Sequence, residues 1–250
     1  EKVLSSIQKY KVELLPTSPT FLNLVLISEA HMRYDISSLK TISYGTEPMP
    51  KSTLSSFNKL YPNIRLLQTY GLSEVGILRS KSKSSSSLWM KIGGEDFKTR
   101  VVDNVLHIKA KSAMLGYLNA PSPFTKDGWF NTGDYVEVKD GYVKIYGRRS
   151  DIINVGGQKV YPSEVEGILQ EIEEVYEATV HKEENAILGN IVCAVITPKV
   201  KVDNDKLIRK IKRYCHKNMQ RYMVPIKIDV VPFMQHSKRF KKTRLRKPIN

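Results

Sequence analysis

The chain has 250 residues, 41% of them hydrophobic and 9% aromatic, which is typical of a globular protein with one large domain or two small ones. It contains no run of 18 apolar residues, which excludes a membrane-spanning helix, and its two cysteines are too few for a disulfide framework or a zinc site. Residues Glu1 to Leu4 lack an initiator methionine and the apolar stretch of a signal peptide. We expect a cytoplasmic protein whose chain begins inside a longer one.

The positive charge lies almost entirely at the end of the chain. The formal net charge is +15, and the segment from Lys199 to Asn250 carries 17 basic and 3 acidic residues. A basic tail of this kind favours contact with a polyanion: nucleic acid, anionic lipid, or the phosphate groups of a cofactor.

Strands and helices alternate in the first 80 residues. The hydrophobic pattern predicts strands at 12–15, 39–44 and 64–69, and helices that end at residue 10 or span 19–30 and 51–61, with Thr17 or Ser18 as a cap. This alternation indicates a mostly parallel sheet, in which ligands gather at the carboxyl ends of the strands. Gly45 and Gly71 both follow such strand ends.

The pattern changes after residue 80. Residues Ser80 to Ser87 read as a solvated linker, and short alternating segments follow, including a hairpin with a turn at Lys139-Asp140-Gly141. We expect a small antiparallel, barrel-like β subdomain at 81–149. In the last part we expect helices at 163–174 and 204–218 and strands at 177–181, 191–198 and 226–231.

The predicted organisation is α/β plus α+β. The segment 1–80 is part of a layered large α/β domain, 81–149 is the small β subdomain, and 150–250 is a small, mobile α+β domain.

Three motifs carry the chemistry. The longest runs from Gly147 to Glu166 and combines glycines, fixed charges and a proline before a helix. The second is Trp129 to Asp134, with the core Thr-Gly-Asp, and the third is Gln68 to Glu74, with Tyr-Gly-Leu-Ser-Glu directly after a predicted strand. In this order and spacing they resemble the adenylate-forming enzymes: acyl- and aryl-CoA synthetases, luciferase and the adenylation domains of peptide synthetases. The resemblance covers the whole chain.

The resemblance implies a two-step reaction. A carboxylate attacks the α-phosphate of Mg-ATP to give an acyl-adenylate, and a thiol of coenzyme A or of a carrier protein's phosphopantetheine then displaces AMP. The family's phosphate-binding loop, rich in Ser, Thr and Gly, has no counterpart here. We therefore expect the C-terminal half of an enzyme about twice this length, inactive by itself in adenylation.

The resemblance also implies roles for residues of the large domain. Tyr70, followed by Gly71, would stack on adenine; Ser73 would bond the α-phosphate; and the Glu74 carboxylate would bind Mg²⁺. Ser73 and Glu74 also fit a helix N-cap with an acidic first turn. Gly45 and Thr46 correspond to the adenine loop, where the family usually has Gly-Ala-Pro, and a plain turn fits them almost as well.

Further roles fall in the second half of the chain. Asp134 would accept hydrogen bonds from the ribose hydroxyls, and Arg148 would add a second ribose contact. Ser150 corresponds to the hinge. Lys159 would approach the phosphates, or is a solvated strand lysine. Gly156 and Gly157 would line the pantetheine channel, or form a simple turn.

The catalytic lysine is assigned by counting from Pro232, which places it at Lys241, with Phe240 where the family has glycine. It would bridge the substrate carboxylate and the α-phosphate during adenylation. Lys238 and Lys242 are competitors, and the alternative is that Lys241 is one more member of a solvated basic run.

The leading hypothesis is an AMP-forming acid–thiol ligase of the acyl-CoA synthetase kind that acts on a small-molecule carboxylic acid. The alternatives are an adenylation domain that loads a carrier protein, a degenerate member that binds AMP without turnover, and a non-catalytic module that holds a polyanion with its basic tail. Nucleic acid fits the tail poorly, because only Phe240 is an aromatic among its cations.

Overall fold

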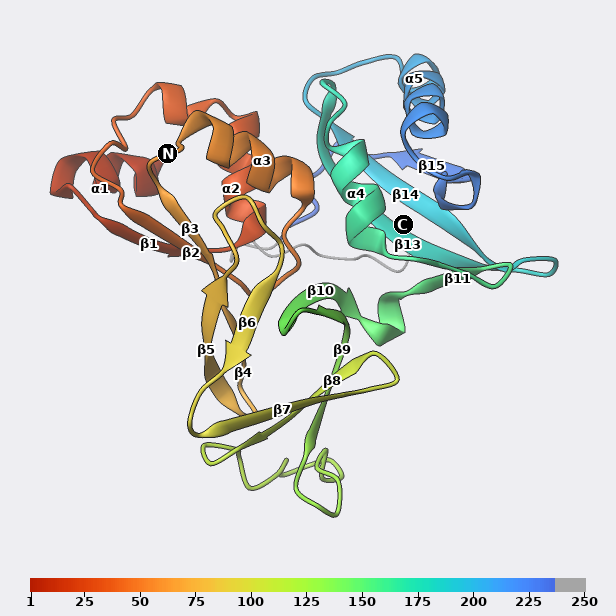
Figure 1. The fold of residues 1–250 in the computed structure, drawn as a ribbon. Helices are drawn as coiled ribbons and strands as arrows, with labels where there is room; N and C mark the ends of the chain where they lie inside the picture. The colour runs from red at the N-terminus through yellow and green to blue at the C-terminus, as the bar shows by residue number, and fades with distance from the viewer. Residues whose placement is uncertain (237–250) are drawn as a thin grey trace. The chain divides into compact units, whose positions relative to one another are not determined.

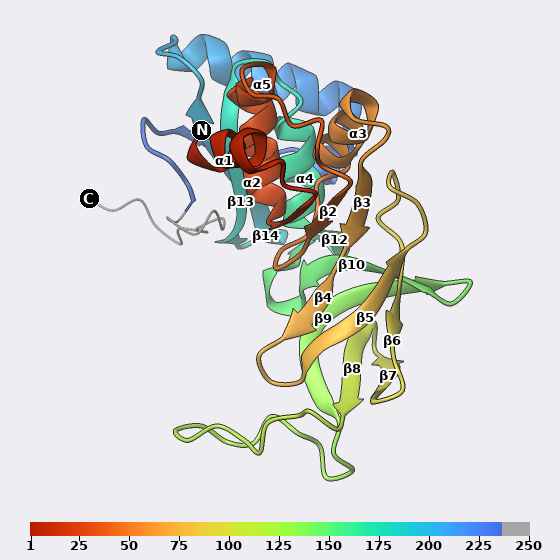
Figure 2. The same ribbon diagram turned by 90° about the vertical axis from the view of Figure 1, so that its left-hand side faces the viewer.

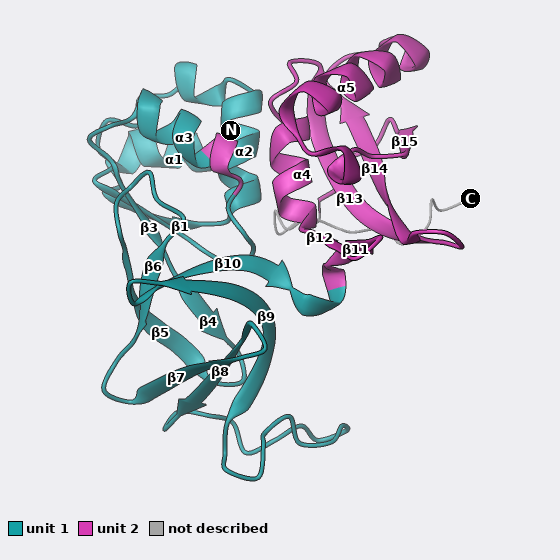
Figure 3. Cartoon of the chain, turned by 45° about the vertical axis from the view of Figure 1, so that its right-hand side comes forward, with its two compact units in different colours: residues 1–49, 54–150 teal, residues 50–53, 151–250 magenta. Residues whose placement is uncertain are grey.

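A computed structural model describes residues 1–236 of the chain (Figure 1). The described residues form two compact units, one of residues 1–49 with 54–150 and the other of residues 50–53 with 151–236 (Figure 3). Among the described residues, no helix is long and apolar enough to cross a membrane.

The first unit begins with a parallel sheet of three strands. Its order is β1-β2-β3, with β1 at Leu14–Thr17, β2 at Thr41–Tyr44 and β3 at Arg65–Gln68. Three helices accompany it, namely α1 (Lys2–Tyr10), α2 (Pro19–Ile27) and α3 (Lys51–Leu60). The carboxyl ends of β1, β2 and β3 align, because Thr17 pairs with Tyr44 and Tyr44 with Gln68. The predicted strand–helix alternation and its shared strand edge are therefore confirmed.

The start of α2 shows why this helix forms where it does. Ser18 is the N-cap, and its hydroxyl accepts a hydrogen bond from the Phe21 amide over 3.2 Å, with Pro19 in the first turn. The helix ends at Ile27 rather than at residue 30, since Glu29 takes a left-handed conformation with φ of 52°. A 3₁₀ helix at Ala30–Met32 follows.

The second part of this unit is a seven-stranded antiparallel sheet. Its order is β4-β5-β6-β10-β9-β8-β7 (Figure 2). The strands are β4 (Tyr70–Leu72), β5 (Gly76–Ser82), β6 (Met90–Gly93), β7 (Phe97–Val102), β8 (Val105–Ala110), β9 (Phe130–Lys139) and β10 (Tyr142–Arg148). The predicted hairpin is confirmed: Lys139 pairs with Tyr142 across Asp140 and Gly141, both with positive φ, as a tight hairpin turn requires.

The sheet begins earlier than the sequence suggests. Its first strand starts at Tyr70, and the expected boundary between residues 80 and 81 falls inside β5. The solvated linker predicted for Ser80–Ser87 is wrong, because two of its serines serve the edge of β3. The Ser82 hydroxyl accepts from the Gln68 amide over 2.8 Å, and the Ser85 hydroxyl from the Leu66 amide over 3.1 Å.

The second unit is built on a five-stranded sheet with two helices. The sheet runs β12-β11-β14-β13, and β15 pairs with β14 in parallel. Its elements are β11 (Ile153–Val155), β12 (Gln158–Val160), α4 (Pro162–Leu169), β13 (Val175–Asn185), β14 (Gly189–Pro198), α5 (Asn204–Asn218) and β15 (Lys227–Val230), with a 3₁₀ turn at Arg221–Met223. A further 3₁₀ turn, Arg149–Asp151, spans the boundary between the two units. Helix α5 matches its predicted bounds, and α4 is shorter than the predicted 163–174.

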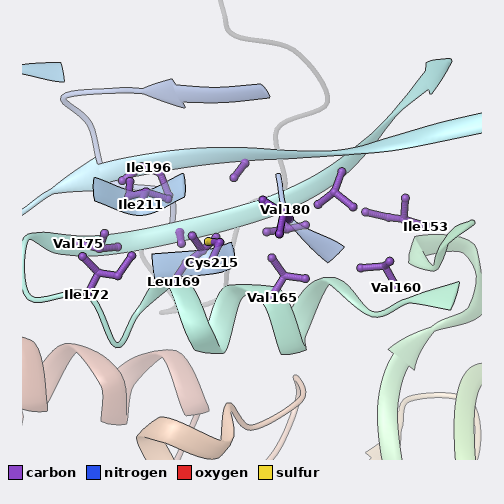
Figure 4. Close-up of a cluster of buried hydrophobic side chains, with 14 of the residues drawn as sticks. Ile153, Val160, Val165, Leu169, Ile172, Val175, Val180, Ile196, Ile211 and Cys215 are labelled. Carbon is purple, nitrogen blue, oxygen red and sulfur yellow. The ribbon is translucent and has the colours of Figure 1, made fainter. Parts of the chain in front are cut away.

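One face of this sheet packs against both helices. Figure 4 shows Val165 and Leu169 of α4 with Ile211 and Cys215 of α5 against the strands. Each of these four side chains is fully buried, and full burial of a Val, Leu or Ile contributes about 1.5–3 kcal/mol. This core accounts for the folding of the C-terminal unit and leaves the other face of the sheet for polar contacts. The α/β plus α+β organisation predicted from the sequence is confirmed.

Candidate active site

The glycine after β2 lies where two strand ends come close together. The Thr69 amide donates to the Tyr44 carbonyl over 2.8 Å, and Gly45 donates to the Thr17 carbonyl over 3.4 Å. A Cβ on Gly45 would stand 2.6 Å from Oγ1 and 2.9 Å from the carbonyl oxygen of Thr69. Residue 45 is therefore glycine because the adjoining backbone leaves no room for a side chain.

The departure from the family at residue 47 has a local explanation, whereas nothing in the structure explains the threonine at residue 46. Thr46 takes a left-handed conformation with φ of 73°. Oε1 of Glu47 accepts a hydrogen bond from the Thr20 amide over 2.8 Å, at the first turn of α2. A carboxylate is favourable there because helix N-termini present unpaired N–H groups and positive partial charge. Glu47 therefore satisfies an amide in the first turn of α2, in addition to the Ser18 cap, while Gly45 and Thr46 shape the loop.

Tyr70 begins β4 and is largely buried. Its side chain packs in the core of the seven-stranded sheet with 9% of its surface exposed, and its hydroxyl donates to Oδ2 of Asp134 over 2.5 Å. Burial, followed by the nearby Asp134 charge, raises the pKa of Tyr70 well above its ordinary value. The hydroxyl therefore remains a hydrogen-bond donor at neutral pH.

The next residue, Gly71, faces Ile77 on β5. A Cβ at Gly71 would lie 2.9 Å from the Cα of Ile77 and 3.0 Å from the Gly76 carbonyl oxygen. Glycine is required here by the close approach of β5, which keeps Tyr70 in its place at the start of β4.

Asp134 and Arg148 pair directly across β9 and β10. The Arg148 Nε lies 3.3 Å from Oδ1 of Asp134, and its Nη1 also donates to the Thr132 carbonyl. The Asp134 amide in turn donates to the Thr132 hydroxyl over 3.0 Å. Residues Tyr70, Asp134 and Arg148 thus form one connected group in the first unit, called below the carboxylate cluster.

The segment of Ser73 and Glu74 is a hairpin turn between β4 and β5. Val75 donates to the Leu72 carbonyl over 3.2 Å, and Gly76 has a φ of 89°, a three-residue loop closed by a left-handed glycine. The alternative of a helix N-cap is therefore wrong. Ser73 is exposed, and Oε1 of Glu74 accepts from the Tyr117 hydroxyl over 2.7 Å. This hydrogen bond raises the pKa of Tyr117.

The structure places the remaining expected residues in or beside the second unit. Gly156 and Gly157 form a tight turn between β11 and β12, with φ of 54° and 87°. Positive φ explains these glycines, since a Cβ on Gly157 would meet no atom within 4 Å. Lys159 is exposed on β12, and Ser150 lies in the 3₁₀ turn where the first unit ends. Lys241 lies outside the described residues.

Two residues that sequence reasoning did not single out contribute to the site. Tyr117 reaches Glu74 from 43 positions away, and no local pattern marks it. Thr132 supports Asp134 through its hydroxyl, which donates to the Leu106 carbonyl over 2.7 Å. Thr132 is the first residue of the Thr-Gly-Asp motif, and this position was the feature of the sequence that could have identified it as part of the site.

A cavity of about 360 Å³ in the first unit lies at the amino ends of the strands of the parallel sheet, opposite their carboxyl ends. Its lining includes Leu39 and Ile64, which precede β2 and β3, whereas Gly45 and Thr69 follow them. This cavity is therefore separate from the candidate site.

Known protein families and individual proteins resemble this chain over most of its length. The sequence profile of the AMP-binding enzyme family matches residues 1–93, and that of the AMP-binding enzyme C-terminal domain matches residues 164–241. Acyl-CoA synthetase 7 of Caenorhabditis elegans is 27% identical over 240 residues, covering 86% of this chain and 44% of the relative. Peroxisomal OPC-8:0-CoA ligase 1 of Arabidopsis thaliana is 30% identical over 203 residues, covering 72% and 37%.

A solved structure has the same fold. The anthranilate CoA ligase AuaEII, in complex with anthranoyl-AMP, superposes with a TM-score of 0.81 at 22% identity, over 97% of this chain and 50% of that one. The chain spans less than half the length of the two relatives named above. Two matching family profiles, these relatives and the shared fold lead to one conclusion: the chain belongs to the AMP-binding, adenylate-forming enzyme superfamily.

Proposed function

We propose that the protein of which this chain is a part activates a carboxylic acid with ATP. The acid would form an acyl-adenylate with release of pyrophosphate, and a thiol would then displace AMP. The observation that carries the proposal is the carboxylate cluster of the first unit, in a chain of this superfamily. A carboxylate held by Tyr70 and Arg148 is preset in one orientation, and its two oxygens offer about four acceptor directions.

Each candidate site residue of the first unit has a role in this proposal. Asp134 would accept the ribose hydroxyls of the nucleotide, with Arg148 as a neighbouring donor. Tyr70 would border the adenine, and the Gly45–Thr46 loop would approach the base with its backbone. Ser73 would donate its hydroxyl to the α-phosphate. Gly71 lets β5 approach closely and so fixes the start of the Ser73–Glu74 turn.

Magnesium fits the donor chemistry of the turn. Mg²⁺ is usually held by one or two carboxylates together with substrate phosphates, and it neutralises charge that develops on phosphate oxygens. Glu74 offers such a carboxylate, half-buried and oriented by the Tyr117 hydroxyl. Its task in the proposal is to present an oxygen next to the phosphates.

The second unit would serve both steps. A lysine of the basic run, Lys241 by the count from Pro232, would neutralise charge on the substrate carboxylate and α-phosphate during adenylation. Lys159 would lie near the phosphates in one arrangement of the units, and the Gly156–Gly157 turn would line the thiol's channel in the other. Ser150, at the boundary of the units, would be the hinge. The thiol in this proposal is that of coenzyme A; a carrier protein's phosphopantetheine is the alternative acceptor.

The nucleotide site can be tested on this chain by calorimetry with AMP and with 2′,3′-dideoxy-AMP. The proposal expects AMP to bind at least tenfold more tightly, because loss of both hydroxyls removes partners of a charged acceptor worth ~1.5–3 kcal/mol each. Equal affinity for the two nucleotides would contradict the role of Asp134.

The reaction is tested by ATP–pyrophosphate exchange with the full-length protein and a panel of octanoic, palmitic, benzoic and amino acids. Exchange that depends on one class of acid supports adenylation and identifies the substrate class. Silence across the panel, together with salt-steep binding to DNA, would instead favour a polyanion-binding module.

A further inference from the structure

The face of the second unit's sheet that is turned away from α4 and α5 carries buried polar residues. Glu177 of β13 and Thr197 of β14 are 4% and 5% exposed, and Gln235, in the segment after β15, is 2% exposed. A buried polar group costs free energy unless it is hydrogen-bonded, so a group of them in one place requires a specific set of partners. The partners here come from the segment that follows β15.

This segment is tied to the sheet by hydrogen bonds from Gln235. Its amide donates to Oε2 of Glu177 over 2.6 Å, and its side-chain Nε2 donates to the Thr197 hydroxyl over 2.9 Å and to the Val195 carbonyl over 3.2 Å. The Thr197 hydroxyl itself donates to the Phe233 carbonyl over 2.8 Å. Backbone and side chain of Gln235 are both held.

The same carboxylate also holds the next residue. Nδ1 of His236 contacts Oε1 of Glu177, and the two side chains are only 13% and 5% exposed. Glu177 therefore bridges the Gln235 backbone and the His236 ring, one with each oxygen. Together, Glu177, Gln235 and His236 hold the segment after β15 on the sheet, and we call these three residues the anchor.

The position of the anchor in the sequence, directly before the basic run, indicates what role these residues have. Two residues after His236 begins a run with seven basic residues between Lys238 and Lys247 and no acidic one. Every lysine in it is tethered to the point at which His236 is held.

An anchor of this chemistry specifies geometry better than it stabilises. Apolar residues of similar volume often stabilise as well as a buried ion pair or better, whereas directional hydrogen bonds fix one arrangement. We propose that Glu177, Gln235 and His236 are positioning residues that set where the basic run begins and so place its lysine for adenylation. This inference rests on the proposed function and deepens it.

The test separates the two half-reactions of the full-length protein. Glu177→Ala and His236→Ala are each assayed for ATP–pyrophosphate exchange with the acid that the panel identifies, and for thioester formation from the supplied acyl-adenylate and coenzyme A. Misplacing a catalytic group by about 1 Å costs up to ~100-fold, so we expect exchange to fall ~10- to 100-fold. Thioester formation, which does not use the lysine in this proposal, should change less than about twofold.

Glu183→Gln is the matched control. Glu183 lies on the same strand, β13, but its carboxylate pairs with Lys227 of β15. Its loss should leave both half-reactions unchanged. If Glu177→Ala and His236→Ala lower both half-reactions equally, in step with a lower melting temperature, the role is only structural and the inference is wrong.

A readout without activity keeps the result clear. Hydrogen–deuterium exchange of a peptide covering residues 233–236 should become faster in Glu177→Ala and stay as in the unaltered protein in Glu183→Gln. If hydrogen–deuterium exchange of this peptide becomes faster in Glu177→Ala but ATP–pyrophosphate exchange is undiminished, the positioning role is wrong and the proposed function remains intact. If the full-length protein shows no ATP–pyrophosphate exchange with any acid of the panel, the proposed function is wrong, and so is this inference.

Discussion

The Tyr70 hydroxyl donates to Oδ2 of Asp134 over 2.5 Å, although β4 and β9 are not neighbours in the sheet. Strands β5, β6 and β10 lie between them in the sheet order. In a flat sheet, four spacings of about 4.8 Å would separate the two strands by ~19 Å. The contact therefore requires a sheet that twists and curls, as antiparallel sheets do. The curl brings the Tyr-Gly motif and the Thr-Gly-Asp motif together.

Removal of the Asp134 carboxylate should weaken nucleotide binding. In Asp134→Ala, Tyr70 and Arg148 lose a shared acceptor, and the ribose hydroxyls lose theirs. We expect AMP to bind ~10- to 100-fold more weakly, because charged hydrogen bonds contribute ~1.5–3 kcal/mol each. Calorimetry measures this, with Asp140→Asn in the β9–β10 turn as the control. An affinity that is the same in Asp134→Ala as in the unaltered chain would rule out the ribose role.

Stability should fall in alkaline solution, in part through Tyr44. Burial raises the pKa of Tyr44 well above its ordinary value. Unfolded tyrosine ionises with a pKa of ~10, whereas folded Tyr44 keeps its proton, so the unfolded state gains as the pH rises above 10. The contribution of protonated Tyr44 to the free energy of unfolding is therefore complete below pH 10, and above pH 10 it falls by up to ~1.4 kcal/mol per pH unit.

This prediction is checked by urea unfolding at pH 9, 10 and 11. Tyr44→Phe should lose stability less steeply than the unaltered chain. Tyr10→Phe, at a site that is 67% exposed, should follow the unaltered chain. A Tyr44→Phe variant with an unchanged slope would contradict the pKa shift.

Gly71→Ala should destabilise the first unit by ~1–3 kcal/mol, the usual cost of overpacking. The added Cβ would lie 2.9 Å from the Cα of Ile77 and 3.0 Å from the Gly76 carbonyl oxygen, which are backbone atoms, and 3.1 Å from the side-chain Cγ1 of Ile77. Ile77→Ala removes only the last of these contacts, so we expect it to restore only a small part of the stability that Gly71→Ala loses, as measured by thermal unfolding of the single and double variants. If the double variant recovers the lost stability, side-chain crowding is the cause instead.

Alanine scanning of the basic run should identify the lysine that acts in adenylation. Lys238→Ala, Lys241→Ala and Lys242→Ala are compared by ATP–pyrophosphate exchange in the full-length protein. We expect Lys241→Ala to lower exchange ~100- to 1000-fold, the cost of losing one donor to a developing negative charge. A loss of that size in Lys238→Ala or Lys242→Ala, with Lys241→Ala nearly unchanged, would reassign the residue.

Local signals were sufficient for several elements. Helix α5 has the predicted bounds because Asp203 caps it, accepting from the Lys206 amide over 3.0 Å, and because its apolar residues repeat with helical spacing. The hairpin at Asp140 and Gly141 followed from turn chemistry. In each of these cases the stabilising contacts lie within a few residues of one another.

Local signals failed where distant partners decide. The serines near residue 80 read as a solvated linker, yet Ser82 and Ser85 satisfy the backbone of β3. Ser73 and Glu74 also fit a helix start, but pairing of Leu72 with Gly76 makes them a hairpin turn. Neither partner can be seen from local composition.

The sequence by itself determined the superfamily, the alternation of elements and the residue types of the site, because motif spacing and hydrophobic period are local properties. Only the tertiary structure decided which of these residues meet. Asp134 lies beside Tyr70 because a sheet curls, and Glu177 holds Gln235 because β13 and the chain after β15 are packed together. Contacts of this kind depend on how strands twist and stack across long sequence separations, which a linear pattern does not encode in any one segment.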